Sequence, residues 1–284
     1  MGFVINNNLA ANNSYRSLNN TQTDLSKSLE KLSTGLRINR AGDDAAGLSI
    51  SEGLKAQVTG SAQAARNAQD GISVIQTAEG ALTEVHSILQ RVRDLAVQAG
   101  NDSNNADART AIGKEVTALG DELERMSAAT NFNGISLLSG ATSGNGAGEM
   151  VFQVGAGSDQ TSNQITVSTS SAGMDVSAIA TAVKGLDFTD ATTSAAAIGT
   201  VDTNIAAVSA SRADLGASQN RLEHTIKSLN VAGENLQAAQ SRIADVDMAQ
   251  EMVKFTKANI LSQAGTAMLA QANQSSQGVL SLLR

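Results

Sequence analysis

Apolar and small residues recur at alternating steps of three and four along most of this sequence. The longest regular series covers residues 198–243 and keeps this spacing for more than six heptads. Such a series forms one stripe along a helix, and sustained heptads are typical of helices packed as coiled coils. The 284 residues include no proline, so very long helices are possible. The pattern therefore predicts a mainly α protein in which long helices pack as coiled coils.

The first helix is expected to span roughly residues 5–34. It ends near Gly35, because glycine readily adopts the backbone conformation that closes a helix. Its seam follows the same three-four spacing and is predicted to run through Ala11, Tyr15, Leu18, Gln22, Leu25, Leu29, Leu32 and Leu36.

Two further helices are expected before residue 130. One covers residues 45–99, and Asp43 or Asp44 is available to cap its first turn. The sequence GNDSNN at 100–105 breaks it, and a third helix follows from about 107 to 129. The seam of the second helix is predicted to run through Leu54, Val58, Ser61, Ala65, Ala68, Ile72 and Ile75, and then through Ala78, Leu82, Val85, Leu89, Val92, Ala96 and Ala99.

The two ends of the chain share an unusual composition. Residues 1–15 and 258–283 carry no charged side chain but contain many Asn and Gln residues. Helices in water usually carry Lys and Glu outside, while lipid would leave the amides without hydrogen-bond partners. We therefore expect both ends to pack against each other and against neighbouring protein, and to order fully only on assembly.

The last forty-three residues, 242–284, are predicted to form one long helix that continues the heptads before it. Its predicted apolar stripe, the face for a partner, comprises Ile243, Val246, Ala249, Val253, Ile260, Ala264 and Ala267.

The segment from 140 to 190 has a different character, because it is rich in Gly, Ser and Thr. Residues 151–154 and 164–167 alternate apolar and polar side chains around a glycine-containing stretch. This spacing predicts a β-hairpin. The overall expectation is antiparallel long helices from both termini with a small β-hairpin insert in the middle.

Several classes of function are disfavoured by composition. The net charge of −7 argues against nucleic-acid binding, which needs a basic surface. The sequence has no cysteine, no run of 18 apolar residues and no basic segment followed by an apolar one at its start. We therefore expect no disulfide, no membrane span and no cleavable secretory signal.

The sequence offers little for catalysis. His86 and His224 lie in no motif that pairs a base with a nucleophile, so ordinary helix positions are the favoured interpretation. Asp245 and Asp247 lack the rest of a calcium loop, and a solvated face is favoured over a metal site. We expect neither an enzyme nor a cofactor or metal protein.

Four sequence blocks resemble bacterial flagellin. They are LEKLSTGLRIN at 29–39, DDAAGLSIS at 43–51, LQRVRDLAVQA at 89–99 and the segment beginning RIADVDMAQEMV at 242–274. The resemblance covers about 1–140 and 195–284 and implies a structural subunit that self-assembles into the hollow helical filament used for swimming motility.

The resemblance also implies a domain organisation. Residues 1–43 and 235–284 would form an inner coiled-coil domain of the filament core. Residues 44–130 and 190–234 would form an outer helical rod domain, with 131–189 as its small β-hairpin insert. The residues expected to carry core assembly are Leu9, Leu18, Leu25, Leu29, Leu32, Val253, Ile260, Ala267 and Leu280.

Partners and location follow from the same resemblance. The chain would be exported through the flagellar secretion apparatus to the extracellular filament, with a secretion chaperone and with the flagellar cap and hook-associated proteins as partners. Toll-like receptor 5 is a further expected partner. The flagellin motif that this receptor recognises also faces a subunit neighbour in the filament. It maps onto Gln90, Arg91, Asp94, Leu95 and Glu115, with Asp94 in place of the more usual Glu.

Two alternatives remain open from the sequence. The first is a hook-filament junction protein, which shares the terminal motifs but usually has a larger middle. The second is a non-flagellar coiled-coil scaffold or a membrane-surface amphipathic protein, although the chain lacks a basic, aromatic-flanked face for lipid.

Overall fold

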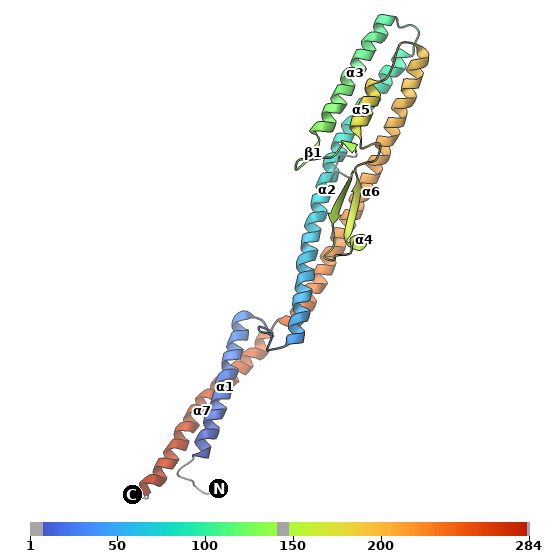
Figure 1. Ribbon diagram of the computed structural model, residues 1–284. Coiled ribbons are helices and arrows are strands. Elements are labelled where there is room, and N and C mark those ends of the chain that lie inside the picture. The colour runs from blue at the N-terminus through green and yellow to red at the C-terminus, as the bar shows by residue number, and fades with distance from the viewer. Residues whose placement is uncertain (1–7, 141–147, 283–284) are drawn as a thin grey trace. The chain divides into compact units, whose positions relative to one another are not determined.

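The computed structural model describes residues 8–140 and 148–282, with side chains as far as residue 274. The chain divides into two compact units. We name them the terminal unit, Met1–Ala56 with Asn235–Arg284, and the central unit, Gln57–Glu234. Long helices dominate both units, as Figure 1 shows, and no described helix is long and apolar enough to cross a lipid bilayer.

The terminal unit contains a pair of antiparallel helices, α1 (Leu9–Thr34) and α7 (Met248–Leu282). The side chain of Asn8 caps α1 by accepting the N–H of Ala11 at 3.0 Å. Gly35 closes the helix with a φ of 73°, a left-handed conformation that favours glycine. The predicted end of the first helix is confirmed, and its predicted start at residue 5 lies outside the described residues.

The seam between α1 and α7 contains more small side chains than large ones. Its positions still follow steps of three and four, as the heptad pattern predicts, but several large residues assigned to it lie elsewhere. Tyr15 and Leu29 are exposed, and so is Gln22. The half-buried and buried positions that keep this spacing are Ala11, Ser14, Leu18, Thr21, Leu25, Ser28 and Leu32 in α1, and Glu251, Phe255, Ala258, Ser262, Gly265, Leu269 and Ala272 in α7.

The prediction of one uninterrupted helix over 242–284 is wrong. Helix α6 (Ala191–Ala244) ends at residue 244, and α7 starts only at Met248. The segment after α1 binds the carbonyl groups at the end of α6. The Arg37 N–H donates to the Ala244 carbonyl at 2.6 Å, and the Arg37 guanidinium donates to the Ile243 carbonyl. These bonds occupy carbonyls at the end of α6, so the chain leaves the helix there.

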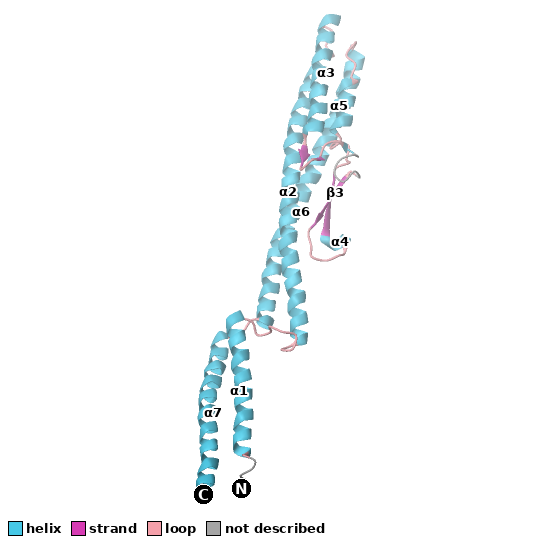
Figure 2. Cartoon of the chain, turned by 60° about the vertical axis from the view of Figure 1, so that its left-hand side comes forward, coloured by secondary structure: helices cyan, strands magenta, loops and turns pink. Residues whose placement is uncertain are grey.

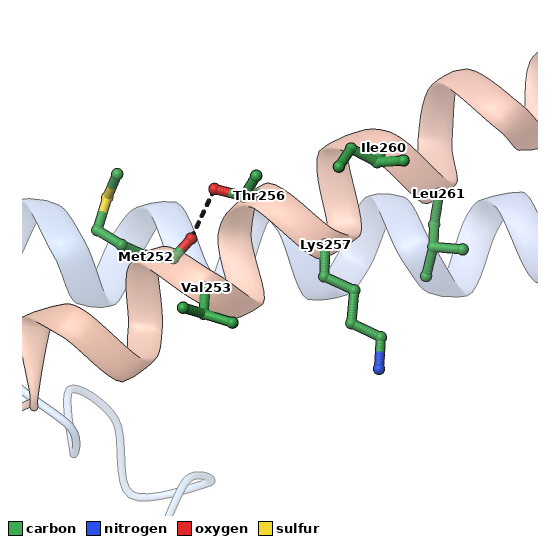
Figure 3. A pocket seen from close by; sticks show the side chains of 6 residues that line it. All are labelled: Met252, Val253, Thr256, Lys257, Ile260 and Leu261. Atoms are coloured by element: carbon green, nitrogen blue, oxygen red, sulfur yellow. Dashed lines mark hydrogen bonds between the residues drawn. The ribbon is translucent and has the colours of Figure 1, made fainter.

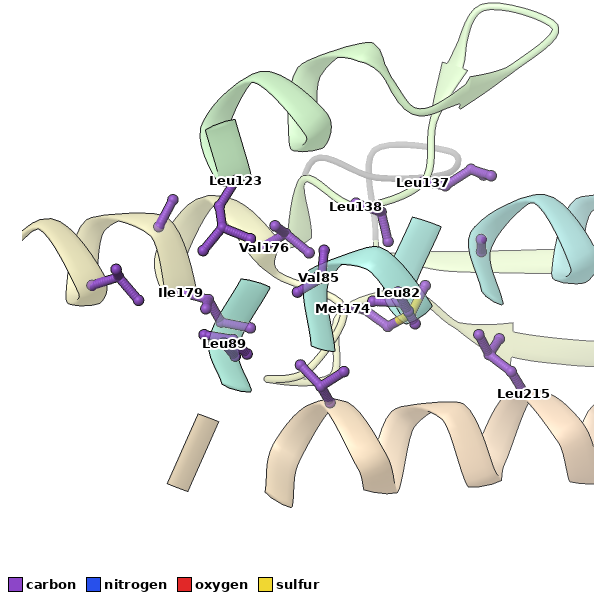
Figure 4. Packing of buried hydrophobic residues seen from close by; sticks show 14 of the residues in the cluster. Leu82, Val85, Leu89, Leu123, Leu137, Leu138, Met174, Val176, Ile179 and Leu215 are labelled. Atoms are coloured by element: carbon purple, nitrogen blue, oxygen red, sulfur yellow. The ribbon is translucent and has the colours of Figure 1, made fainter. Parts of the chain in front are cut away.

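The central unit is built on the parts of α2 (Ala45–Ala99) and α6 that lie within residues 57–234. They run antiparallel and are joined by ion pairs of Arg93 with Asp202 and of Arg212 with Glu79. Helix α3 (Ala106–Ala129) and the short α5 (Val176–Lys184) pack together beside them. Figure 4 shows side chains from all four helices meeting in one core. Most of the predicted α2 seam is confirmed as buried, from Ala68 and Ile75 to Ala99.

The predicted hairpin is confirmed. Strands β3 (Glu149–Gln153) and β4 (Gln164–Ser168) pair antiparallel, with Val151 opposite Thr166. Their connection includes the short helix α4 (Gln160–Asn163), and a smaller hairpin of β1 (Asn131–Phe132) and β2 (Ile135–Ser136) follows α3. Figure 2 shows these strands against the helical background. Neither α4 nor α5 was predicted.

Candidate functional site

Large apolar side chains that face solvent are concentrated on the helix pair of the terminal unit. Among the described residues, fourteen large hydrophobic side chains are strongly exposed, and nine of them belong to α1 or α7. This is unlike a scatter of single surface residues, which would need no explanation. The nine are Leu9, Tyr15, Leu29, Met248, Met252, Val253, Ile260, Leu261 and Met268.

Six residues of α7 line a shallow apolar hollow on the side of the helix away from α1, shown in Figure 3. A second hollow lies along the same pair of helices and includes Leu18 of α1. Leu261 lines both hollows, so the apolar surface is continuous. We call Met252, Val253, Ile260, Leu261 and Met268 the α7 patch.

The α7 patch has no partner within the described chain. Val253 is 68% exposed and Ile260 61% exposed. Burying one such side chain is worth about 1.5–3 kcal/mol. Lys257 is the one charged residue among those that line the two hollows, so covering them desolvates little charge on α7. The patch is therefore suited to contact with another protein surface.

The predicted assembly residues fall into two groups. Leu18, Leu25 and Leu32 are half-buried on the seam between α1 and α7. The exposed group consists of Leu9, Leu29, Val253, Ile260 and Ala267. Leu280 belongs to α7, but its side chain lies outside the part of the chain whose side chains are described.

The predicted stripe of α7 does not face α1. Val253, Ile260 and Ala267 are exposed, and the small residues Ala258 and Gly265 lie on the seam instead. A Cβ on Gly265 would lie 3.2 Å from the Leu18 side chain, which shows how closely the two helices approach. Helix α7 therefore has two separate faces, one for α1 and one left open.

Glu251 is the buried carboxylate of the α1–α7 seam and is 4% exposed. Ser28 of α1 donates its hydroxyl to one carboxylate oxygen at 2.7 Å, and Lys254 donates to the other at 3.0 Å. Burial raises the pKa of this carboxyl, but the two hydrogen bonds and the charges of Lys254 and Lys31 outweigh burial. The pKa of Glu251 therefore lies below its ordinary value of 4.5.

The seam is expected to weaken in acid because of this carboxylate. A group with a lowered folded-state pKa stabilises the fold above its ordinary pKa, and this contribution is lost as the pH falls through the folded-state value. Thermal melts followed by circular dichroism from pH 7 to pH 3 should show an acid-dependent loss of helix. The matched variant Glu251→Gln keeps the shape of the side chain and the acceptor for Ser28. Its melting temperature should therefore fall less than that of the wild type as the pH is lowered. Equal acid sensitivity of both proteins would contradict the prediction.

Four of the five predicted receptor-motif residues are exposed, and the fifth, Leu95, is buried. The Arg91 guanidinium of α2 donates two hydrogen bonds to Glu115 of α3, at 3.1 and 2.7 Å. Gln90 and Asp94 are also exposed. Leu95, in contrast, is 2% exposed and belongs to the core, so it can only support this surface from beneath.

The two aspartates considered for metal binding, Asp245 and Asp247, make local hydrogen bonds at the ends of α6 and α7. Asp247 accepts the N–H groups of Ala249 and Gln250 and so caps α7, while Asp245 accepts the Ser241 hydroxyl at 2.6 Å. Within residues 8–140 and 148–282, no group of three or more His, Asp or Glu side chains is placed to hold a metal ion. Sequence reasoning missed the capping role of Asp247, although an aspartate ahead of an apolar-periodic run is a known signal for it.

Comparison with known proteins identifies two matching family models. The bacterial flagellin N-terminal helical region matches residues 5–143, and the bacterial flagellin C-terminal helical region matches residues 198–283. A flagellin of Halalkalibacterium halodurans is 53% identical over 281 residues, covering 99% of this chain and all of that protein. A flagellin of Bacillus subtilis is 52% identical over 306 residues, covering 99% of each chain. The crystal structure of Bacillus cereus flagellin is 31% identical, with a TM-score of 0.48, and covers 58% of this chain and 88% of that one.

Proposed function

Because this chain belongs to the bacterial flagellin family and is a structural subunit of the extracellular flagellar filament, we propose that the α7 patch is a surface through which its copies polymerise. The family also sets aside the alternative of a non-flagellar scaffold, and the chain is a structural protein rather than an enzyme.

The observation that carries this proposal is the second, open face of α7. A helix needs only one face to pair with α1, and the seam already supplies it. A second apolar face, on which Lys257 is the one charged residue lining the hollows, is costly to leave in water. A homopolymer covers such a face in every subunit at once, because each copy presents the same surfaces.

Polymerisation of the purified chain tests this function. Salt-precipitated protein examined by electron microscopy should form tubes with a central lumen. Sedimentation against protein concentration should then give a critical concentration. Amorphous precipitate under all conditions that polymerise other flagellins would contradict the proposal.

The two compact units support an assignment of the chain to an inner and an outer domain of the filament. We propose that residues 1–43 and 235–284 form the inner coiled-coil domain and that 44–130 and 190–234 form the outer rod domain, with 131–189 as its insert. The clustering of Met1–Ala56 with Asn235–Arg284 supports the inner domain. The flagellar cap, the hook-associated proteins and a secretion chaperone are its proposed further partners.

We also propose that the surface around Arg91 is recognised by Toll-like receptor 5 in the monomer. Arg91→Ala removes both hydrogen bonds that the guanidinium donates to Glu115 Oε1, and it is expected to weaken receptor activation by purified monomer about tenfold. Arg125→Ala is the matched control, because it removes an exposed arginine that pairs with Glu122 on α3. A reporter-cell assay compares the two. Unchanged activation by Arg91→Ala, or an equal loss in both variants, would contradict the assignment.

A further inference from the structure

The methionines of this chain differ sharply in their access to solvent. Within the described side chains, the three in the central unit lie in or against the hydrophobic core, and Met174 is 1% exposed. The three in α7 are open to solvent: Met248 is 50% exposed, Met252 48% and Met268 66%. A reagent in solution therefore reaches the α7 methionines first.

Two of the exposed methionines occupy the α7 patch. Met252 lines the first hollow with Val253 and Ile260, as Figure 3 shows. Met268 lines the second hollow, and Leu261 joins the two. Met248 is the first residue of α7 and lines neither hollow. The thioethers of Met252 and Met268 thus contribute apolar surface where the proposed subunit contact forms.

We propose that Met252 and Met268 form an oxidation site that decides whether a free subunit can assemble. This inference rests on the proposed role of the α7 patch in polymerisation. The reagent is a two-electron oxygen donor such as hydrogen peroxide. The thioether sulfur attacks the peroxide, the O–O bond breaks, and sulfoxide and one water molecule form. Sulfur is oxidised by two electrons and the peroxide is reduced by two.

Oxidation changes the chemistry of the patch without changing the fold of the monomer. A sulfoxide is polar and carries a strong hydrogen-bond acceptor, whereas a thioether is apolar. In the monomer both groups point into water, so the change is tolerated. In a subunit contact the sulfoxide oxygen must be desolvated without a built-in donor, which raises the critical concentration about tenfold.

Assembly protects the same residues. A methionine covered by a neighbouring subunit is shielded from peroxide, so the filament resists a dose that inactivates free subunits. The change is also reversible, because methionine sulfoxide reductases restore the thioether. Peroxide therefore oxidises these methionines in free subunits and not in assembled ones.

The test compares the full-length wild type with the double variant Met252→Leu/Met268→Leu, in which leucine keeps the apolar surface but cannot be oxidised. Each monomer is treated with hydrogen peroxide, and oxygen addition at every methionine is measured by peptide mass spectrometry. Critical concentrations are measured before and after treatment. Wild type is expected to gain oxygen at 248, 252 and 268 before 174 and to lose assembly, and a sulfoxide reductase should restore it. The critical concentration of the double variant should be the same after treatment as before it, although Met248 is oxidised.

Two results would overturn the proposal: unchanged assembly of a wild type oxidised at both positions, or an equal loss in the treated double variant. Failure of the proposed contact itself is recognised separately. In that case Ile260→Asp assembles normally without any oxidant.

Discussion

Replacement of Ile260 by aspartate is expected to abolish filament formation while leaving the isolated chain folded. Ile260 is exposed on the α7 patch and faces away from α1, so a carboxylate there stays in water in the monomer. In the proposed subunit contact the same carboxylate becomes buried without a partner, at a cost of about 3–5 kcal/mol. The critical concentration then rises by about a thousandfold, beyond the range in which the purified protein polymerises.

The matched control for this variant is Val151→Asp. Val151 is also strongly exposed, but it lies on β3 of the central unit. Circular dichroism should show equal helix content in both variants and in wild type. Sedimentation and electron microscopy should then find filaments for Val151→Asp and none for Ile260→Asp. Filaments of Ile260→Asp at the wild-type critical concentration would remove the α7 patch from the assembly surface.

Replacement of Gly173 by alanine is expected to destabilise the central unit. Gly173 is buried where the chain between β4 and α5 crosses α6. A Cβ there would lie 2.1 Å from the backbone oxygen of Ala207 and 2.6 Å from the Ser211 hydroxyl. Because backbone of α6 cannot move aside as a flexible side chain would, we expect a loss of about 2–3 kcal/mol. The melting temperature should fall by about 5–10 °C.

Gly80→Ala provides the matched control for Gly173→Ala. Gly80 is an exposed residue of α2, and a Cβ built on it would have no atom within 4 Å apart from its own residue, its two chain neighbours and the nearby backbone of α2. Alanine there should stabilise the protein by about 0.5–1 kcal/mol, because glycine is a poor helix former. Chemical denaturation of both variants measures the difference. A Gly173→Ala protein as stable as wild type would show that α6 and this crossing segment are not held as closely as the structure describes.

The helices of the central unit could be predicted well because their signals are local. The α2 heptads fix which side chains are buried from Ala68 to Ala99, and the 100–105 break marks the end of α2. The short α5 escaped prediction because it has only two and a half turns. Its signals exist, since Asp175 caps it and Val176, Ile179 and Val183 are buried at helical spacing.

The break between α6 and α7 depends on distant residues and therefore could not be predicted from the local pattern. At the break, the Gly35 carbonyl accepts the N–H of Val246, and Arg37 donates to the carbonyls of Ile243 and Ala244. Gly35 and Arg37 lie some two hundred positions away along the chain. Helical periodicity continues across the break, because Ile243 and Val246 keep the three-residue step. Only the capping aspartate Asp247 could have signalled it.

The faces of α7 could not be assigned from the sequence for a different physical reason. A hydrophobic pattern identifies an apolar stripe but not the partner that covers it. Val253 and Ile260 belong to the predicted stripe, yet the smaller residues Ala258 and Gly265 face α1. Leu95 is a similar case, because the family motif groups it with surface residues and does not show that its side chain is buried.

Electron cryomicroscopy of the assembled filament tests the central claim most directly, because it locates the α7 patch among neighbouring copies. Val253 and Ile260 should have side-chain atoms of a second copy within about 4.5 Å, the distance of apolar contact. Both side chains facing the lumen or the outer solvent, with no second copy in contact, would contradict the account.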